Sequence, residues 1–315
     1  MPTYNRRDAL PKVLGPLLAD EAAREVIVVV DGCSDGSYEY LRQLAVDHPR
    51  LKPILIQNSG QTAAQEAGLE QATSDVVLLL DDDVVPDPGL VHGHARHHAR
   101  STGLVVVGYM PVHIPTTRTP SLFSTVLYAQ EYERAIQTYL RHPDEILHGL
   151  WMGNISLRRA DCIRIGLFNR EWKSIAEFYH IDRDFGLRCM KGGLSAVFDP
   201  TLHGTHFMTR GLDGYLRYAR EQGVGVVALH RLHGDILGPI SLQSFTEDLP
   251  SAVRLLVDAS RRPRLRRAVI GGTSGWIRLA GMFRMTPLQI PAARLARRIE
   301  LLRGAREALY SDSTT

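Results

Sequence analysis

Residues 76–83 read Val76-Val77-Leu78-Leu79-Leu80-Asp81-Asp82-Asp83, five apolar residues followed directly by three carboxylates. An apolar run without polar alternation predicts a strand that is covered on both faces, as in parallel sheets. In open α/β sheets, ligands bind at the loops that follow the carboxyl ends of such strands. The stretch therefore indicates an α/β fold and predicts that the acidic cluster lies at a ligand-binding edge.

Similar runs lie on both sides of this strand. Residues 26–30 are apolar and β-branched, and a turn-rich loop that begins with Asp31 follows them. Short apolar runs that alternate with stretches of helical spacing are typical of βαβ units. We expect strands at 26–30, 52–57, 76–80, 103–112, 155–157 and 195–198, and helices at 8–18, 37–48, 62–72, 121–139 and 182–191. Helical spacing continues from 212, so we predict a Rossmann-like, mostly parallel domain over 1–210 and a helical extension over 211–315.

The composition is that of a globular protein whose charge is unevenly distributed. The 315 residues have a formal net charge of +3, with 44% hydrophobic and 23% charged residues, which excludes a disordered or collagen-like chain. Residues 251–315 contain 13 Arg and 4 acidic residues, whereas 1–250 are acidic overall. No apolar run reaches the roughly 18 residues of a membrane span, and no signal peptide is visible. Three widely spaced cysteines form no disulfide framework, so we expect a cytoplasmic protein.

The acidic cluster at 81–83 indicates a metal site. Adjacent carboxylates repel one another, and each pKa rises unless a cation compensates. Such an oxygen-rich group suits Mg²⁺ or Mn²⁺ held between protein carboxylates and a substrate diphosphate. The alternative is a solvated acidic loop. His203 or His206 could add a nitrogen ligand, and spacing alone does not choose between them.

Other polar residues give weaker signals. Asp182 and Asp184 stand two positions apart at the start of an expected helix, so one should face a pocket while the other caps the helix or faces solvent. Four further histidines have helical spacing, and we expect them on a surface face rather than at a metal. They are His92, His94, His97 and His98.

In their order and spacing, these motifs resemble the family 2 glycosyltransferases of the GT-A fold. The matching segments are 2–6 (PTYNR), 28–36 (VVVDGCSDG), 58–68, 80–86, 153–159 (GNISLRR) and 182–188 (DRDFGLR). The spacing from Pro200 also matches the family's late histidine ligand and favours His206. The resemblance covers roughly 1–210. Four positions depart from the family pattern: Val30, Gln65, Glu66 and Ile181.

This resemblance implies transfer of a sugar from a nucleoside diphosphate, with UDP or dTDP favoured, to an acceptor hydroxyl with inversion. Asp83 and His206 would hold the Mn²⁺ or Mg²⁺, and Asp182 would be the general base. Residues 1–100 would bind the donor, through Pro2, Tyr4, Asn5, Asp31, Asp81 and Asp82. Residues 101–210 would form the acceptor half, with Trp151, Gly153 and Asn154 on the acceptor side. Trp151 could equally be a core residue.

Three alternatives to an inverting transferase stay open. A retaining transferase can use the same fold, and the four departures would suit a nucleotide-sugar-binding protein that has lost its activity. A haloacid-dehalogenase-like phosphatase could use the loop at 81–85. That class places its motif near the first strand and needs a Lys downstream of it. This chain has only 4 Lys and has the motif after its third strand, which counts against this alternative.

The two ends of the chain raise separate questions. In this family a buried strand precedes the segment at 2–6, so we expect either that the strand is absent or that the true start lies upstream of Met1. The Arg-rich extension could contact an anionic membrane or pack on the acidic body or a second subunit, and we favour packing. The high Arg content of the whole chain suggests a bacterial source of high GC content. The acceptor could be a glycan, a lipid-linked molecule or a small molecule, and no nucleic acid partner is expected.

Overall fold

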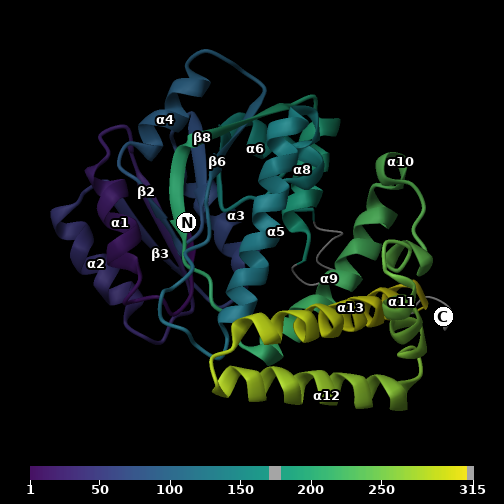
Figure 1. The fold of residues 1–315 in the computed structure, drawn as a ribbon. Coiled ribbons are helices and arrows are strands. Elements are labelled where there is room, and N and C mark those ends of the chain that lie inside the picture. Colours follow the sequence, from purple (N-terminus) through teal and green to yellow (C-terminus); the bar gives the residue numbers. More distant parts are fainter. Residues whose placement is uncertain (170–178, 311–315) are drawn as a thin grey trace. The chain divides into compact units, whose positions relative to one another are not determined.

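The computed structural model describes residues 1–169 and 179–310, which fall into two compact units. Unit 1 comprises Met1–His113, Tyr132–Asn169 and Asp182–Met208. Unit 2 comprises Ile114–Glu131 and the described residues of 170–181 and 209–315. Figure 1 draws the helices and strands of both units and labels most of the helices and some of the strands.

Unit 1 opens with a parallel sheet of three strands in the order β1-β2-β3. The strands are β1 (Pro2–Thr3), β2 (Val26–Asp31) and β3 (Leu51–Ile56), and the helices that follow them are α1 (Leu10–Ala19), α2 (Ser37–Asp47) and α3 (Gln61–Gln71). Val28, Val29 and Val30 have no exposed surface. The prediction of a buried, β-branched strand followed by a helix is thus confirmed here.

The second sheet of unit 1 has five strands in the order β4-β7-β6-β8-β5. They are β4 (Val76–Leu80), β5 (Val84–Pro86), β6 (Leu104–Tyr109), β7 (Asn154–Arg158) and β8 (Ser195–His206). Strands β6 and β8 are parallel, but β7 runs antiparallel to both of its neighbours, and β5 runs antiparallel to β8. This sheet is therefore mixed, because an apolar run reports burial on two faces and not strand direction.

The remaining helices of unit 1 lie around these sheets. They are α4 (Leu90–His98), the C-terminal part of α5 (Leu122–Arg141), α6 (Arg159–Ile165) and α8 (Ile181–Lys191), with short 3-10 turns at Pro143–Glu145 and Leu147–Gly149. One core joins α1 and the sheets, and Leu10, Val106 and Ile155 are among its fully buried members.

The histidines of α4 correct one sequence prediction. His94 and His98 are 1% and 2% exposed, so the expectation that they lie on the surface is wrong. The His94 ring bonds Ser156 Oγ (2.8 Å) and Asn154 Oδ1 (3.0 Å), and burial lowers its pKa to about 4. The histidines do lie on a helix, as their spacing predicts. His94 is nevertheless buried, because Ser156 and Asn154 of β7 form hydrogen bonds with its ring.

A cavity of about 260 Å³ lies between β2 and β4 in unit 1. Met1 stands at one end of it, where its ammonium donates to Ile27 O (3.0 Å) while Val29 N donates to Met1 O (2.9 Å), as in a parallel ladder. Burial lowers the pKa of this ammonium to about 6. The cavity also explains why the β4 residues Val76–Leu78, expected to be fully buried, retain partial exposure.

Unit 2 is helical in its described part. Its main helices are α9 (Leu212–Leu232), α10 (Gly234–Leu237), α11 (Ser251–Ala259), α12 (Pro263–Met282) and α13 (Thr286–Tyr310). Helix α13 packs against both α9 and α12 (Figure 1). Pro263 occupies the first turn of α12, where a proline costs no hydrogen bond. Among the described helices, none has the length and apolar content that a bilayer crossing requires.

We predict that a short β-branched extension ahead of Met1 raises the melting temperature. The extension would convert the buried ammonium into a neutral amide and place apolar side chains in the cavity. Full burial of one such side chain stabilises by about 1.5–3 kcal/mol. Each 1 kcal/mol corresponds to about 2–4 °C in a domain of this size. Thermal unfolding followed by circular dichroism measures the change.

A Gly/Ser extension of equal length is the control, because it removes the charge without filling the cavity. The ammonium pKa falls from 8.0 to about 6 on folding, so its burial destabilises the native state below pH 6, and this effect vanishes above pH 8. The control should therefore stabilise at low pH only, whereas the β-branched extension should stabilise at every pH. Equal melting temperatures for the two extensions would contradict the prediction.

Candidate active site

The acidic cluster lies where β4 ends and β5 begins. The backbone N–H of Asp81 donates to Gly153 O (3.2 Å). The antiparallel register of β5 and β8 sets Val84 opposite His206. Asp83 precedes Val84, and its Oδ1 lies 3.3 Å from His206 Nε2. The pairing of these two strands thus joins a carboxylate and an imidazole that are far apart in the sequence.

The three carboxylates have different electrostatic surroundings. Burial, followed by the charges of Asp83 and Asp182, raises the pKa of Asp81 to about 7. Burial also raises the pKa of Asp82. Burial acts in the same direction on Asp83, but the His206 hydrogen bond and the charges of His206 and Arg6 outweigh it and hold the pKa of Asp83 below its usual value.

Arg6 supplies part of the positive charge that three adjacent carboxylates require. Its Nη2 lies 3.3 Å from Asp83 Oδ2, and its Nε lies 3.8 Å from Asp82 Oδ1. Sequence reasoning asked for a compensating cation but gave Arg6 no role. The available signal was its place in the segment at 2–6, which the family resemblance already included.

Asp182 and Gly153 also lie near Asp81. Met152 N donates to Asp182 Oδ2 (3.1 Å), and burial raises the pKa of Asp182. A Cβ atom at Gly153 would stand 2.9 Å from Asp81 Oδ2 and 2.8 Å from Met110 Sδ. Glycine at this position therefore lets the loop approach the Asp81 carboxylate, which a larger residue would displace.

Asp184, the second aspartate of α8, forms an ion pair inside unit 1. Its side chain is 1% exposed, and its Oδ2 accepts from Arg188 Nε (2.9 Å). Asp184 therefore neither caps the helix nor faces solvent, since α8 is buried around Asp184, Phe185 and Leu187. The spacing of the two aspartates showed that they diverge but not how deeply each is buried.

Asp31 organises the loop that follows β3. Its Oδ1 accepts from Ser59 N (2.7 Å) and its Oδ2 accepts from Gly60 N (2.8 Å), and the residue is 6% exposed. The next residue, Gln61, donates from Nε2 to Asp81 Oδ1 (3.3 Å). This loop therefore connects Asp31 to the acidic cluster. Sequence reasoning missed the link because it gave Gln61 no role, although the residue lies inside the matching segment at 58–68.

The segment after β1 lies against the loop that follows β2. Asn5 adopts a positive φ of 52°, and its Oδ1 accepts from Ser34 N (2.9 Å). Pro2 is buried within β1, whereas Tyr4 is 52% exposed. The hydrogen bond of Asn5 fixes the segment so that the Tyr4 side chain remains accessible.

The residues predicted for the acceptor side separate into two groups. Trp151 is half-buried and packs edge-on against Tyr132, with ring centroids 5.3 Å apart. Asn154 has no exposed surface, and its amide bonds Leu202 O (3.0 Å) and the His94 ring (3.0 Å). Asn154 is thus engaged inside unit 1, whereas Trp151 remains partly exposed.

The donor atoms at this site suit a divalent metal. Carboxylate oxygens with one imidazole nitrogen are ligands that Mn²⁺ accepts, and Mg²⁺ binds to one or two carboxylates together with substrate phosphates. Within residues 1–169 and 179–310, no group of three or more His, Cys, Asp or Glu side chains is close enough to hold a metal alone. Asp83 and His206 fit as a pair of protein ligands whose coordination a substrate diphosphate and water would complete.

Comparisons with known proteins agree with this arrangement. The chain is 40% identical over 97 residues to an undecaprenyl-phosphate 4-deoxy-4-formamido-L-arabinose transferase of Pseudomonas fluorescens, which is 28% of each protein. It is 38% identical over 131 residues to the corresponding transferase of Pectobacterium carotovorum, 39% of this chain and 38% of that protein. The aligned part thus spans less than half of these relatives' length.

A solved structure shows the same fold over nearly the whole chain. A mannosyltransferase of Pyrobaculum calidifontis, solved with GDP-Man and Mn²⁺, has a TM-score of 0.59 at 17% identity, with 98% of this chain and 86% of that chain covered. It supports the GT-A prediction for the fold. Residues 1–166, more than half of the chain, match the model of Glycosyl transferase family 2. The chain therefore belongs to the family 2 glycosyltransferases.

Proposed function

We propose that this protein transfers a sugar from a nucleoside diphosphate, UDP or dTDP, to an acceptor. The observation that supports this most is the contact of Asp83 with His206, together with the charges of Asp83, Asp182 and His206 that act on the buried Asp81. In this proposal residues 1–100 bind the donor, residues 101–210 bind the acceptor, and 211–315 form an extension. Its three cysteines are free, which suits the reducing cytoplasm where we place it.

The donor nucleotide would lie along the ends of β1 and β2. Each Asp31 oxygen accepts one backbone amide, so each retains a lone pair with which to accept a hydrogen bond from the base. Pro2 and Asn5 would line the base together with the exposed Tyr4. Asp81 and Asp82 would contact the ribose or the sugar. Gln61 would couple the two regions, since it bonds Asp81 from the loop that Asp31 holds.

The departing diphosphate would lie against Asp83, His206 and Arg6. A divalent metal, when bound there, would neutralise the negative charge that develops on the leaving group. Arg6 lies 3.3 Å from Asp83, so its guanidinium could move from this carboxylate to the diphosphate. Asp83 and His206 would hold the metal.

Asp182 would accept the proton of the acceptor hydroxyl. Its Oδ2 is held by Met152 N, so Oδ1 is the oxygen available to the substrate. Burial raises the pKa of this carboxyl, and a general base works best when its pKa approaches the working pH. One base and one displacement invert the anomeric carbon, whereas a retaining transferase gives the opposite product. NMR of the product's anomeric proton distinguishes the two.

A second candidate differs in the acceptor group. The relatives from Pseudomonas and Pectobacterium are named for transfer involving undecaprenyl phosphate. A phosphate acceptor is already ionised near neutral pH, since its second pKa is about 6. It would need no general base, and Asp182 would then only hold the loop through Met152.

We expect Asp182→Asn to lose transfer to a hydroxyl acceptor while it retains donor binding. General base catalysis contributes about 10²–10⁴-fold, so the rate should fall by roughly that factor. Turnover is measured as nucleotide release, and donor affinity is measured by titration calorimetry. Asp144→Asn, at an exposed carboxylate of a 3-10 turn, is the control and should behave as wild type. Near-normal turnover of Asp182→Asn with a hydroxyl acceptor would remove Asp182 from the role. Near-normal turnover with lipid phosphate alone would favour the second candidate.

We expect Mn²⁺ with UDP or dTDP to raise the melting temperature of the wild type, and His206→Ala to lose most of that rise. His206 contacts Asp83, so its removal takes one of two protein ligands. His203→Ala is the matched control. His203 lies on the same strand but contacts Asp87 (2.9 Å), and its variant should keep the full rise. The assignment of His206 fails if both variants respond to Mn²⁺ as wild type does.

A further inference from the structure

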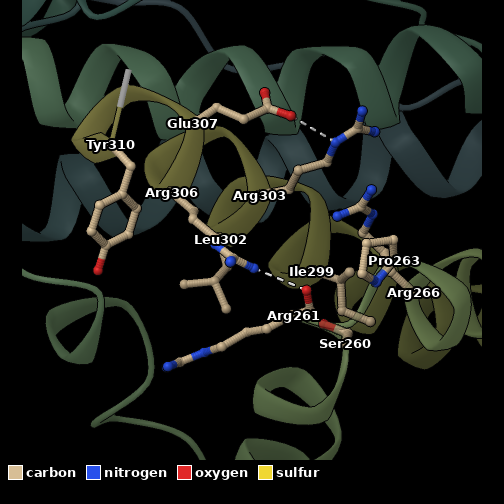
Figure 2. A pocket seen from close by; sticks show the side chains of 10 residues that line it. All are labelled: Ser260, Arg261, Pro263, Arg266, Ile299, Leu302, Arg303, Arg306, Glu307 and Tyr310. Atoms are coloured by element: carbon tan, nitrogen blue, oxygen red, sulfur yellow. Dashed lines mark hydrogen bonds and ion pairs between the residues drawn. The ribbon is translucent and has the colours of Figure 1, made fainter. Parts of the chain in front are cut away.

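Unit 2 contains a pocket of about 480 Å³ that the proposed transfer does not use. It lies between the last turns of α13 and the segment that leads from α11 into α12 (Figure 2). Four of its lining residues are arginines and one is a glutamate. The arginines are Arg261, Arg266, Arg303 and Arg306. They come from both sides, two from α13 and two from the α12 side.

The carboxylate in the lining is already neutralised. Glu307 Oε1 accepts from Arg303 Nε (3.0 Å), and Glu307 Oε2 lies 2.7 Å from Arg220 Nη2. Arg303 also lies 3.3 Å from Glu300. The pocket therefore keeps an excess of positive charge even after its ion pairs are formed.

The arginines keep donors for a ligand. Arg306 uses Nη1 on Arg261 O (2.9 Å), and Arg261 uses Nη2 on Asp258 Oδ1 (2.6 Å). A guanidinium has five N–H donors in a planar fork that matches phosphate oxygens. Several such groups around one cavity repel one another, and a bound anion relieves that repulsion. The chemistry of these walls favours a phosphate.

The rest of the lining is apolar. Ile299 and Leu302 line the pocket but are 1% and 3% exposed, so the accessible carbon surface comes mainly from Pro263 and Tyr310, both of which are exposed. A free inorganic anion would leave this surface in contact with water. A phosphate ester on an apolar body would cover it.

The turn between α12 and α13 also has an apolar surface. Met282, Phe283 and Met285 are 75%, 68% and 46% exposed. Neighbouring exposed side chains of this kind, on a helix pair rich in arginine, are typical of surfaces that contact anionic lipid. This turn lies at the opposite end of α12 and α13 from the pocket, so the choice of a lipid over a soluble phosphate rests on the carbon surface of the pocket itself.

We propose that the pocket binds the phosphate group of an anionic lipid, with the arginines on the phosphate and the apolar wall against the lipid's carbon body. The site is separate from the acidic cluster of unit 1, and its occupation does not depend on the transfer reaction.

Titration calorimetry of the full chain tests this with three probes: monomeric short-chain phosphatidic acid, inorganic phosphate and a short DNA duplex. Phosphatidic acid should bind more tightly than inorganic phosphate, because it also covers the apolar wall. Arg266→Gln should weaken phosphatidic acid binding by about tenfold, the effect of losing one charge-assisted hydrogen bond. Co-sedimentation with phosphatidylcholine vesicles that contain phosphatidic acid should show the same loss.

Arg264→Gln is the matched control, since Arg264 lies on the same helix turn and is exposed but does not line the pocket. Its affinity for the monomeric lipid should stay within about twofold of wild type, because screened surface charges contribute little. Equal losses in both variants would overturn the proposal in favour of a diffuse positive field. Equal affinity for inorganic phosphate, or tighter binding of the duplex, would overturn the lipid assignment. Unchanged melting temperatures of both variants establish that they fold.

Discussion

The antiparallel pairing of β5 with β8 is the constraint on which the candidate site depends. Strand β5 has three residues, yet its register with β8 sets Asp83 beside His206 and lets Phe207 N donate to Asp83 O (2.8 Å). The Asp83 side chain would otherwise share a turn with two like charges and have no imidazole within reach. A single ladder therefore converts a repulsive sequence motif into an ordered group of donor atoms.

The same cluster shows why buried charge is retained in this fold. Asp81 and Asp82 have raised pKa values because burial outweighs the help that nearby cations give. Replacing such a cluster by apolar residues would be expected to stabilise a chain that had no ligand to bind. The cluster is explained if a positively charged ligand binds beside the carboxylates, or if positive charge develops there during the reaction. The proposed transfer requires such a charge.

Much of this could be predicted from the sequence, and the remainder has definite physical causes. The strand at 76–80 and the acidic cluster after it followed from an apolar run that stops abruptly, and the motif order predicted the family. Three features did not follow. The burial of His94 depends on polar side chains of β7, the ion pair of Asp184 depends on the depth of α8, and Gln61 reaches Asp81 through a loop shaped by Asp31. The contacts of His94 and Gln61 join segments that are far apart in the sequence, which no local pattern encodes. The Asp184–Arg188 pair is a local i,i+4 contact, and only its burial depends on how α8 packs.

The loop at 152–153 links the two positions proposed for the substrates. Met152 N binds Asp182, while Gly153 O binds Asp81 N, so two adjacent residues connect the groups proposed for the acceptor and for the donor. A displacement of this loop by one substrate would change the affinity for the other, and by linkage the effect is reciprocal. The donor and the acceptor should therefore bind cooperatively or anti-cooperatively to this protein, each changing the affinity for the other by the same factor.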